Sequence, residues 1–215
     1  MTYRVKEIQY TIQGEGVNAG RPAAFLRFSG CNLWSGREED RSRGPSCSRW
    51  CDTDFRGTDG PNGGVYPDPG SLARACLAVL PADVSTPPLP LLVLTGGEPL
   101  LQLDPPLTHE LRRLGLDLAV ETNGTIPVPA ALGVRHVCVS PKAFAPLRQT
   151  WGTELKVVWP QDQLDLDRLE RLAFGHFLLQ PLDGPGRENH LAACVEAVKL
   201  RPRWRLSVQT HKLLG

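Results

Sequence analysis

Three of the six cysteines, Cys31, Cys47 and Cys51, fall in one polar segment that follows directly on an apolar run. Thiolates gathered in one loop are typical ligands of a zinc ion or of an iron–sulfur cluster. A structural zinc takes four protein ligands, so this trio would need a histidine from elsewhere in the chain. A cubane cluster held by three thiolates instead leaves one iron open to a small molecule. The trio therefore indicates either a zinc site with a borrowed ligand or a reactive cluster.

Composition limits the classes of protein that this chain can represent. With 215 residues, 41% of them hydrophobic, the chain can bury a sizeable core, and we expect one domain over residues 1–215. A net charge of +1 without a long basic run does not indicate a nucleic-acid partner. Apolar runs are too short to span a bilayer, and the first residues do not resemble a secretory signal. We therefore expect a cytoplasmic protein without a membrane partner, in which three cysteines are small core residues (Cys76, Cys138 and Cys194).

Apolar strand-like runs alternate with helical patterns along most of the chain, which predicts a parallel sheet with right-handed crossovers. The helices are too few for an eight-fold barrel. We therefore expect an α/β fold, an incomplete (partial) TIM-like barrel of parallel strands with fewer helices than strands. The predicted strands are 3–11, 23–28, 91–94, 117–120, 135–139, 154–159, 176–179 and 204–208. Helices are predicted with N-caps at Ser71 and Asp104, around 164–172 and over 191–200, with a surface loop at 57–70 and a stiff, proline-rich connection at 81–90.

A polar segment directly follows the carboxyl end of several predicted strands. In parallel α/β folds the carboxyl ends of the strands lie on one side, where ligands bind. The sequence therefore predicts that five segments converge with the cysteine loop on one rim: TGGEP (95–99), ETNG (121–124), SPK (140–142), QPLDG (180–184) and QTHK (209–212).

Arg27 lies in an otherwise apolar predicted strand. Period-two alternation places it on the face of Ala23 and Phe25, opposite Leu26 and Phe28. A guanidinium in this position is either a surface group or a clamp for a carboxylate inside a pocket.

These motifs, together with IQGEG, RFSGCNLWSGREED and CDTDF, resemble the radical S-adenosylmethionine (SAM) superfamily, and within it the 7-carboxy-7-deazaguanine synthase (QueE) family. The resemblance covers nearly the whole chain. Its most specific part is the block CNLWSGREED–CDTDF, which is similar to a subgroup with a long insertion in the cluster-binding loop, here about 29–57. TGGEP alone identifies only the superfamily. Ser48, Arg49 and Trp50 separate the last two cysteines, one residue more than the family pattern has.

The resemblance implies a [4Fe–4S] cluster on Cys31, Cys47 and Cys51, with SAM on the fourth iron. Reductive cleavage of SAM would give a 5′-deoxyadenosyl radical, which abstracts hydrogen from 6-carboxy-5,6,7,8-tetrahydropterin. Ring contraction then releases ammonia and leaves 7-carboxy-7-deazaguanine, a precursor of queuosine and related 7-deazapurines. The family further implies Mg²⁺, with Thr53 as its ligand, an electron donor such as flavodoxin, and a homodimer. No acid–base pair is assigned, because the cofactor supplies the reactivity.

The resemblance also assigns binding residues. Substrate contacts are expected at Ile12, Gln13, Gly14, Arg27 and Thr95, with further polar contacts at Glu15, Glu121 and His211. SAM contacts are expected at Gly97, Ser140, Pro141, Lys142, Gln180, Pro181, Leu182 and Asp183.

Two other functions fit part of the pattern. Another radical SAM enzyme, such as a glycyl-radical-enzyme activase, would share TGGEP and the three cysteines. Arg27 and the IQGEG turn favour a small-molecule substrate over the protein substrate of an activase. A non-catalytic zinc module would use the cysteines and one histidine, but it leaves the convergence of the strand-end segments unexplained.

Overall fold

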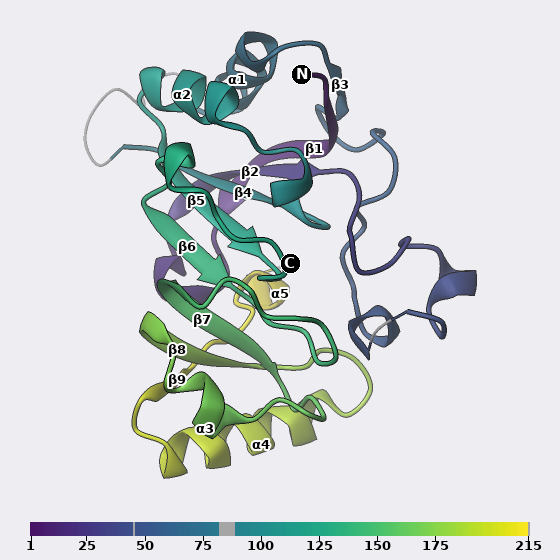
Figure 1. Cartoon of the computed structure of the whole chain (residues 1–215), viewed down its shortest axis with the longest axis vertical. Helices are drawn as coiled ribbons and strands as arrows, with labels where there is room; N and C mark the ends of the chain where they lie inside the picture. Colours follow the sequence, from purple (N-terminus) through teal and green to yellow (C-terminus); the bar gives the residue numbers. More distant parts are fainter. Residues whose placement is uncertain (45, 82–88, 215) are drawn as a thin grey trace.

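One curved sheet organises the chain, as the computed structural model shows for residues 1–44, 46–81 and 89–214 (Figure 1). Within this described part the sheet has nine strands in the order β3-β1-β2-β4-β5-β6-β7-β8-β9. From β2 to β9 neighbouring strands are parallel, whereas β1 runs antiparallel to β2 and β3. The strands are β1 (Tyr3–Ile12), β2 (Pro22–Phe28), β3 (Gly64–Tyr66), β4 (Leu91–Gly96), β5 (Asp117–Thr122), β6 (His136–Val139), β7 (Trp151–Trp159), β8 (Ala173–Pro181) and β9 (Trp204–Leu206).

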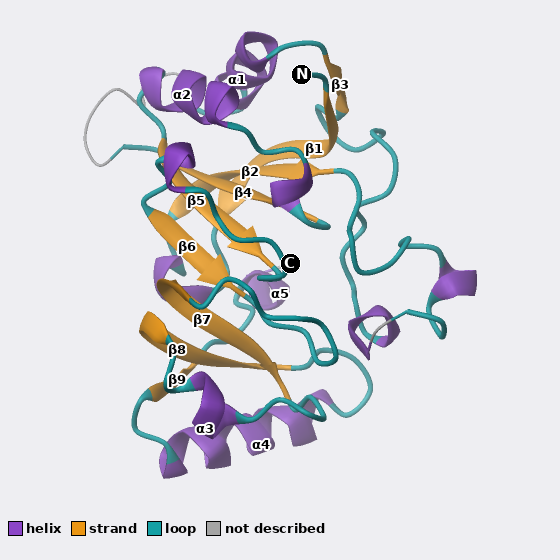
Figure 2. Ribbon diagram, in the orientation of Figure 1, coloured by secondary structure: helices purple, strands orange, loops and turns teal. Residues whose placement is uncertain are grey.

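Helices α1 to α4 lie along the convex side of the sheet, whereas α5 lies on the concave side (Figure 2). Helices α1 and α2 pack on each other beside the N-terminal strands, and α4 packs on β8 and β9. The helices are α1 (Pro69–Ala78), α2 (Pro105–Arg113), α3 (Leu166–Leu169), α4 (Arg187–Leu200) and α5 (His211–Leu214), with short 3-10 turns η1 (Gly16–Asn18), η2 (Glu38–Asp40), η3 (Ser46–Arg49), η4 (Pro99–Leu101) and η5 (Ala130–Leu132). The order of the strands is linear, so this is the open α/β sheet expected of a partial barrel, with fewer helices than strands.

The two faces of the sheet differ in chemistry. Side chains such as Leu26, Phe28 and Leu94 point to the helices and are fully buried in the main core. Burying each such side chain contributes about 1.5–3 kcal/mol. The alternate positions face the concave side, where a small apolar cluster (Ala23, Phe25, Leu91, Val93 and Ala119) lies toward the amino ends of the strands. Arg27 and Thr95 follow in register on that face, as the alternation predicted.

Several boundaries differ from the prediction. Helix α1 is capped by Asp68 rather than by Ser71, because the Asp68 carboxylate accepts a hydrogen bond from the Ser71 amide at 2.8 Å. Pro69 in the first turn has a φ suited to the start of a helix. The predicted loop 57–70 contains β3, which pairs with β1. Strands β7 and β8 begin earlier than predicted, β9 ends at Leu206, and the helix predicted around 164–172 is the single turn α3.

The predicted cap of α2 and the burial of three cysteines are confirmed, whereas one predicted connection lies mostly outside the described residues. Asp104 caps α2, as predicted. The three scattered cysteines are buried (Cys76, Cys138 and Cys194). Most of the proline-rich connection predicted at 81–90 lies outside the described residues. Among the described helices, none is long and apolar enough to cross a membrane.

We predict that Asp104→Ala destabilises the protein more than Asp68→Ala does. Both carboxylates cap a helix, which is worth about 1 kcal/mol. Asp104 also accepts a hydrogen bond at 2.7 Å from the hydroxyl of the fully buried Tyr3. Losing that acceptor should add about 1–3 kcal/mol. Chemical denaturation measures both variants, and equal losses of unfolding free energy would contradict this account.

Candidate functional site

A cavity of about 700 Å³ opens at the carboxyl ends of the parallel strands. Its wall combines the cysteine loop, the turn after β1, the ends of β4 to β8 and the segment after β9. Of the residues predicted from the sequence, Pro141 is buried and is not among those that line the cavity. The others line it: Ile12, Gln13, Gly14, Glu15, Arg27, Cys31, Cys47, Cys51, Thr53, Thr95, Gly97, Glu121, Ser140, Lys142, Gln180, Pro181, Leu182, Asp183 and His211.

The cysteine trio faces this cavity as free thiols. Burial raises the pKa of Cys31, and it raises the pKa of Cys47 to about 11 although the nearby Lys142 charge opposes it. Cys47 and Cys51 are joined by one helical turn, in which the Cys51 amide donates to the Cys47 carbonyl at 2.8 Å. A spacing of four residues places both on one side of that turn. The residue added between these cysteines therefore completes a turn.

The cysteine trio is not arranged as a site for a single metal ion. Within the described ranges, no three His, Cys, Asp or Glu side chains are gathered closely enough to hold a single metal ion. A single zinc draws four ligand atoms to about 2.0–2.3 Å. A cubane cluster is a larger body and spaces its thiolates further apart.

The TGGEP segment holds the start of the cysteine loop. The Glu98 amide donates to the Gly30 carbonyl at 3.0 Å. The Glu98 carboxylate is fully buried and accepts hydrogen bonds from the Asn123 amide and the Thr122 hydroxyl at the end of β5. Burial raises the pKa of Glu98, against the effect of these donors. Glu98 thus joins β4, β5 and the cysteine loop, a role that the sequence did not indicate.

The SPK segment lies beside the last cysteine. Lys142 donates to the Ser140 hydroxyl at 2.6 Å, and its ammonium lies 5.3 Å from the centre of the Trp50 ring. Burial lowers the pKa of Lys142, and the thiol of Cys47 opposes that shift. A cationic group is therefore held next to the cysteine trio.

Lys212 binds two segments of the wall together. Its ammonium lies 2.6 Å from a carboxylate oxygen of Asp52 in the cysteine loop and 2.6 Å from one of Asp183 in the QPLDG segment. The hydrogen bond from Lys212 lowers the pKa of Asp183. His211 packs on Gly14, whose carbonyl accepts hydrogen bonds from the Thr210 amide and hydroxyl at 3.0 Å each. The segment after β9 therefore closes the cavity against the turn after β1.

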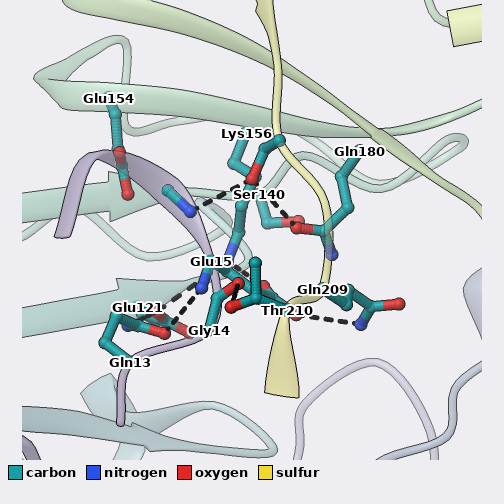
Figure 3. Close-up of polar contacts among 12 residues, drawn as sticks. Gln13, Gly14, Glu15, Glu121, Ser140, Glu154, Lys156, Gln180, Gln209 and Thr210 are labelled. Carbon is teal, nitrogen blue, oxygen red and sulfur yellow. Dashed lines mark hydrogen bonds and ion pairs between the residues drawn. The ribbon is translucent and has the colours of Figure 1, made fainter. Parts of the chain in front are cut away.

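Arg27 is a pocket residue rather than a surface one. Its Nε donates to Glu7 at 2.8 Å, and the guanidinium lines the cavity. Deeper in the same cavity, on the concave face, Lys156 contacts the Glu15 carboxylate and lies 3.8 Å from that of Glu121 (Figure 3). Lys156 was missed because it sits within the apolar strand sequence ELKVVW, and only its inward position at alternate spacing could have marked it.

An open, mostly parallel α/β sheet with a polar cavity and a cysteine loop at the carboxyl ends of its strands defines an enzyme of the partial-barrel class. No protein-family model matches the chain. It is 53% identical over 215 residues to the 7-carboxy-7-deazaguanine synthase of Burkholderia multivorans, covering 100% of this chain and 99% of that protein. It is 52% identical to the protein of the same name from Nitratidesulfovibrio vulgaris, with coverage of 100% and 99%.

A solved structure agrees with these relatives. The crystal structure of QueE from Escherichia coli superposes with a TM-score of 0.70 at 25% identity, covering 97% of this chain and 94% of that one. The chain belongs to the 7-carboxy-7-deazaguanine synthase family and is an enzyme. These full-length similarities do not favour an activase.

We predict that Gly97→Ala disturbs the cysteine loop, whereas Gly64→Ala does not. A methyl group at Gly97 would overlap the Gly30 carbonyl and approach the Cys31 Cβ to 2.7 Å. At Gly64 the nearest atom beyond its chain neighbours is a ring carbon of Tyr66 at 3.7 Å, an ordinary contact. Overpacking of this kind costs about 1–3 kcal/mol. Denaturation midpoints and the rate of Cys31 alkylation measure the effect, and an undisturbed Gly97→Ala variant would show that the loop tolerates the methyl group.

Proposed function

We propose that the enzyme converts 6-carboxy-5,6,7,8-tetrahydropterin to 7-carboxy-7-deazaguanine with release of ammonia, by radical SAM chemistry in the cytoplasm. The observation that carries this proposal is the convergence, in one cavity, of the cysteine trio with the strand-end segments of the family pattern. The similarity to 7-carboxy-7-deazaguanine synthases over the full length supports the same reaction. We further propose a single domain, a homodimer and an external electron donor such as flavodoxin.

The cysteine residues fit a [4Fe–4S] cluster. Cys31, Cys47 and Cys51 offer three soft sulfur donors to one cavity, and the described residues contain no disulfide between them. When bound, the cluster supplies the electron that cleaves the carbon–sulfur bond of SAM. Since burial keeps Cys31 and Cys47 protonated on their own, their thiolates form only as the iron displaces the protons. Without iron, these two thiols therefore stay in their unreactive, protonated form.

The neighbouring segments suit the binding of SAM. Gly97 lacks a side chain, so the backbone at the end of β4 can approach a charged ligand closely. Ser140, Lys142 and residues 180–183 line the same cavity as the cysteines. We propose that these residues bind and orient SAM beside the cysteines and exclude water.

Arg27 suits the binding of a pterin carboxylate. Arg27 uses its Nε for Glu7, and a guanidinium has five N–H donors, so it retains donors for a ligand. We propose that Arg27 binds the carboxylate of the substrate, while Gln13, Gly14, Thr95 and their neighbours contact the ring.

Thr53 has a position suited to a magnesium ligand. It lies between Asp52 and Asp54, whose carboxylates already pair with Lys212 and Lys6 at 2.6 and 2.7 Å. Thr53 therefore offers an oxygen to Mg²⁺ at the cavity wall, and we propose that substrate and water complete the octahedron.

The proposed reaction is tested by product formation. The protein, reconstituted with iron and sulfide under anaerobic conditions and reduced, should convert 6-carboxytetrahydropterin to 7-carboxy-7-deazaguanine in the presence of SAM and Mg²⁺. Mass spectrometry of the product and an ammonia assay measure the conversion, and omission of SAM is the control. Cleavage of SAM without the deazaguanine product would contradict the proposed substrate.

We predict that Cys47→Ala lowers the iron content and abolishes turnover, whereas Cys194→Ala retains both. Cys47 lines the cavity, but Cys194 belongs to α4 and its side chain is buried in the main core. Each substitution replaces a CH2SH side chain by a methyl group, so the difference isolates the ligand role. Iron and sulfide analysis with the absorption spectrum provides the measurement. Full cluster loading in Cys47→Ala would show that another residue is the ligand.

A further inference from the structure

Lys156 is a buried cation that lines the cavity, and we call Lys156, Glu15 and Glu121 together the cavity floor (Figure 3). Only 4% of its surface is exposed, although it carries an ammonium group. That ammonium donates to the Glu15 carboxylate from the turn after β1 and lies 3.8 Å from the Glu121 carboxylate at the end of β5. Removing a charge from water in this way is costly unless the charge is paired, so the three side chains form one unit.

Each carboxylate has a second partner that fixes its direction. The amide of Gln209 donates to Glu15 at 2.9 Å, and the amide of Gln13 donates to Glu121 at 3.0 Å. The turn that carries Glu15 is itself anchored, because the Val17 amide donates to Glu154 on β7 at 2.7 Å. The two carboxylates are therefore held at fixed positions in the floor, and both side chains line the cavity.

Electrostatics favour the charged form of this unit. Burial alone would raise the pKa of Glu15, but the charge and hydrogen bond of Lys156 outweigh it and hold the pKa well below its usual range. Burial likewise would lower the pKa of Lys156, and the carboxylates of Glu121 and Glu15 raise it instead. The other titratable groups around the unit are Cys138, Lys142, Glu154 and His211.

Two carboxylates face one ammonium here, so the floor has more acceptors than Lys156 can use. We propose that Lys156 is a positioning residue that holds Glu15 and Glu121 as a pair of acceptors for the N–H groups of the pterin ring. A reduced pterin presents several ring N–H groups and an amino group, which complement carboxylate oxygens. This inference rests on the proposed function. It divides substrate recognition between Arg27, for the carboxylate, and the floor, for the ring.

The test compares Lys156→Met with Lys199→Met in the reconstituted enzyme. Lys199 lies on the exposed side of α4 and pairs with Glu196, so it serves as the matched control. Lys156→Met should raise the KM for 6-carboxytetrahydropterin about tenfold or more, the value of a charge-assisted hydrogen bond, with a smaller change in kcat. Iron content should not change, because the carboxylates that Lys156 contacts belong to Glu15 and Glu121 and not to the cysteine loop.

A pH profile separates positioning from a merely structural role. Without the ammonium, burial raises the pKa of Glu15, so the carboxyl is protonated below that pKa and regains its charge as the pH rises. The KM of Lys156→Met should therefore fall as the pH rises, while that of the wild type stays flat. Lys156→Arg keeps the charge and should recover most of the loss. Glu15→Gln should also raise the KM, but without this dependence on pH, and adding Lys156→Met to it should cause little further loss.

The outcomes are distinct. If the wild type makes no deazaguanine, the proposed function fails and this inference fails with it. If the wild type is active and Lys156→Met matches Lys199→Met, only the inference is wrong. If Lys156→Met loses iron or SAM affinity as strongly as it loses pterin affinity, Lys156 has a structural role instead. If that variant does not fold, Glu15→Gln decides, because an unchanged pterin KM in Glu15→Gln would also overturn the proposal.

Discussion

The contact between the Lys156 ammonium and the Glu15 carboxylate joins the turn after β1 to β7 across the concave face of the sheet. An open sheet has no hydrogen bonds that close its concave side, so side chains must do so. Here these contacts are polar. The Val17 amide donates to the Glu154 carboxylate, and the Thr210 hydroxyl donates to the Gly14 carbonyl. Because the groups are buried, each depends on its partner, and the loss of one would leave the others desolvated and unpaired. The shape of the cavity floor follows from this set of contacts.

Much of the fold follows from local patterns in the sequence. The fully apolar run 91–94 is typical of a strand covered on both faces, and Asp104 before two prolines is a strong helix start. Alternation placed Arg27 on the concave face because that rule depends only on the pleat. The convergence of the strand-end segments was predictable for a similar reason, since parallel strands present their carboxyl ends on one side.

The features that the sequence did not reveal depend on distant partners. Strand β3 is short and is stabilised by its pairing with β1, and no local sequence pattern predicts it. Lys156 is paired with carboxylates on two other segments, those of Glu15 and Glu121. Thr210, which is 196 residues away from Gly14 in the sequence, donates to the Gly14 carbonyl. Pro141 was expected to contact SAM as one of three consecutive residues, but its two neighbours face the cavity and it does not. A sequence motif identifies the segment near the ligand, whereas the backbone conformation determines which of its side chains face the cavity.

The added residue between Cys47 and Cys51 shows how a departure from the family pattern is absorbed. With three intervening residues the segment completes a helical turn, closed by the Cys51 amide on the Cys47 carbonyl. The insertion stabilises the end of that turn, because Arg41 donates to the carbonyls of Ser48 and Cys51 at 2.6 and 3.2 Å. The Arg41 guanidinium also lies 4.9 Å from the centre of the Trp34 ring, on the other side of the loop. Arg41, in the long insertion, therefore satisfies carbonyls at the end of the turn that the wider cysteine spacing completes.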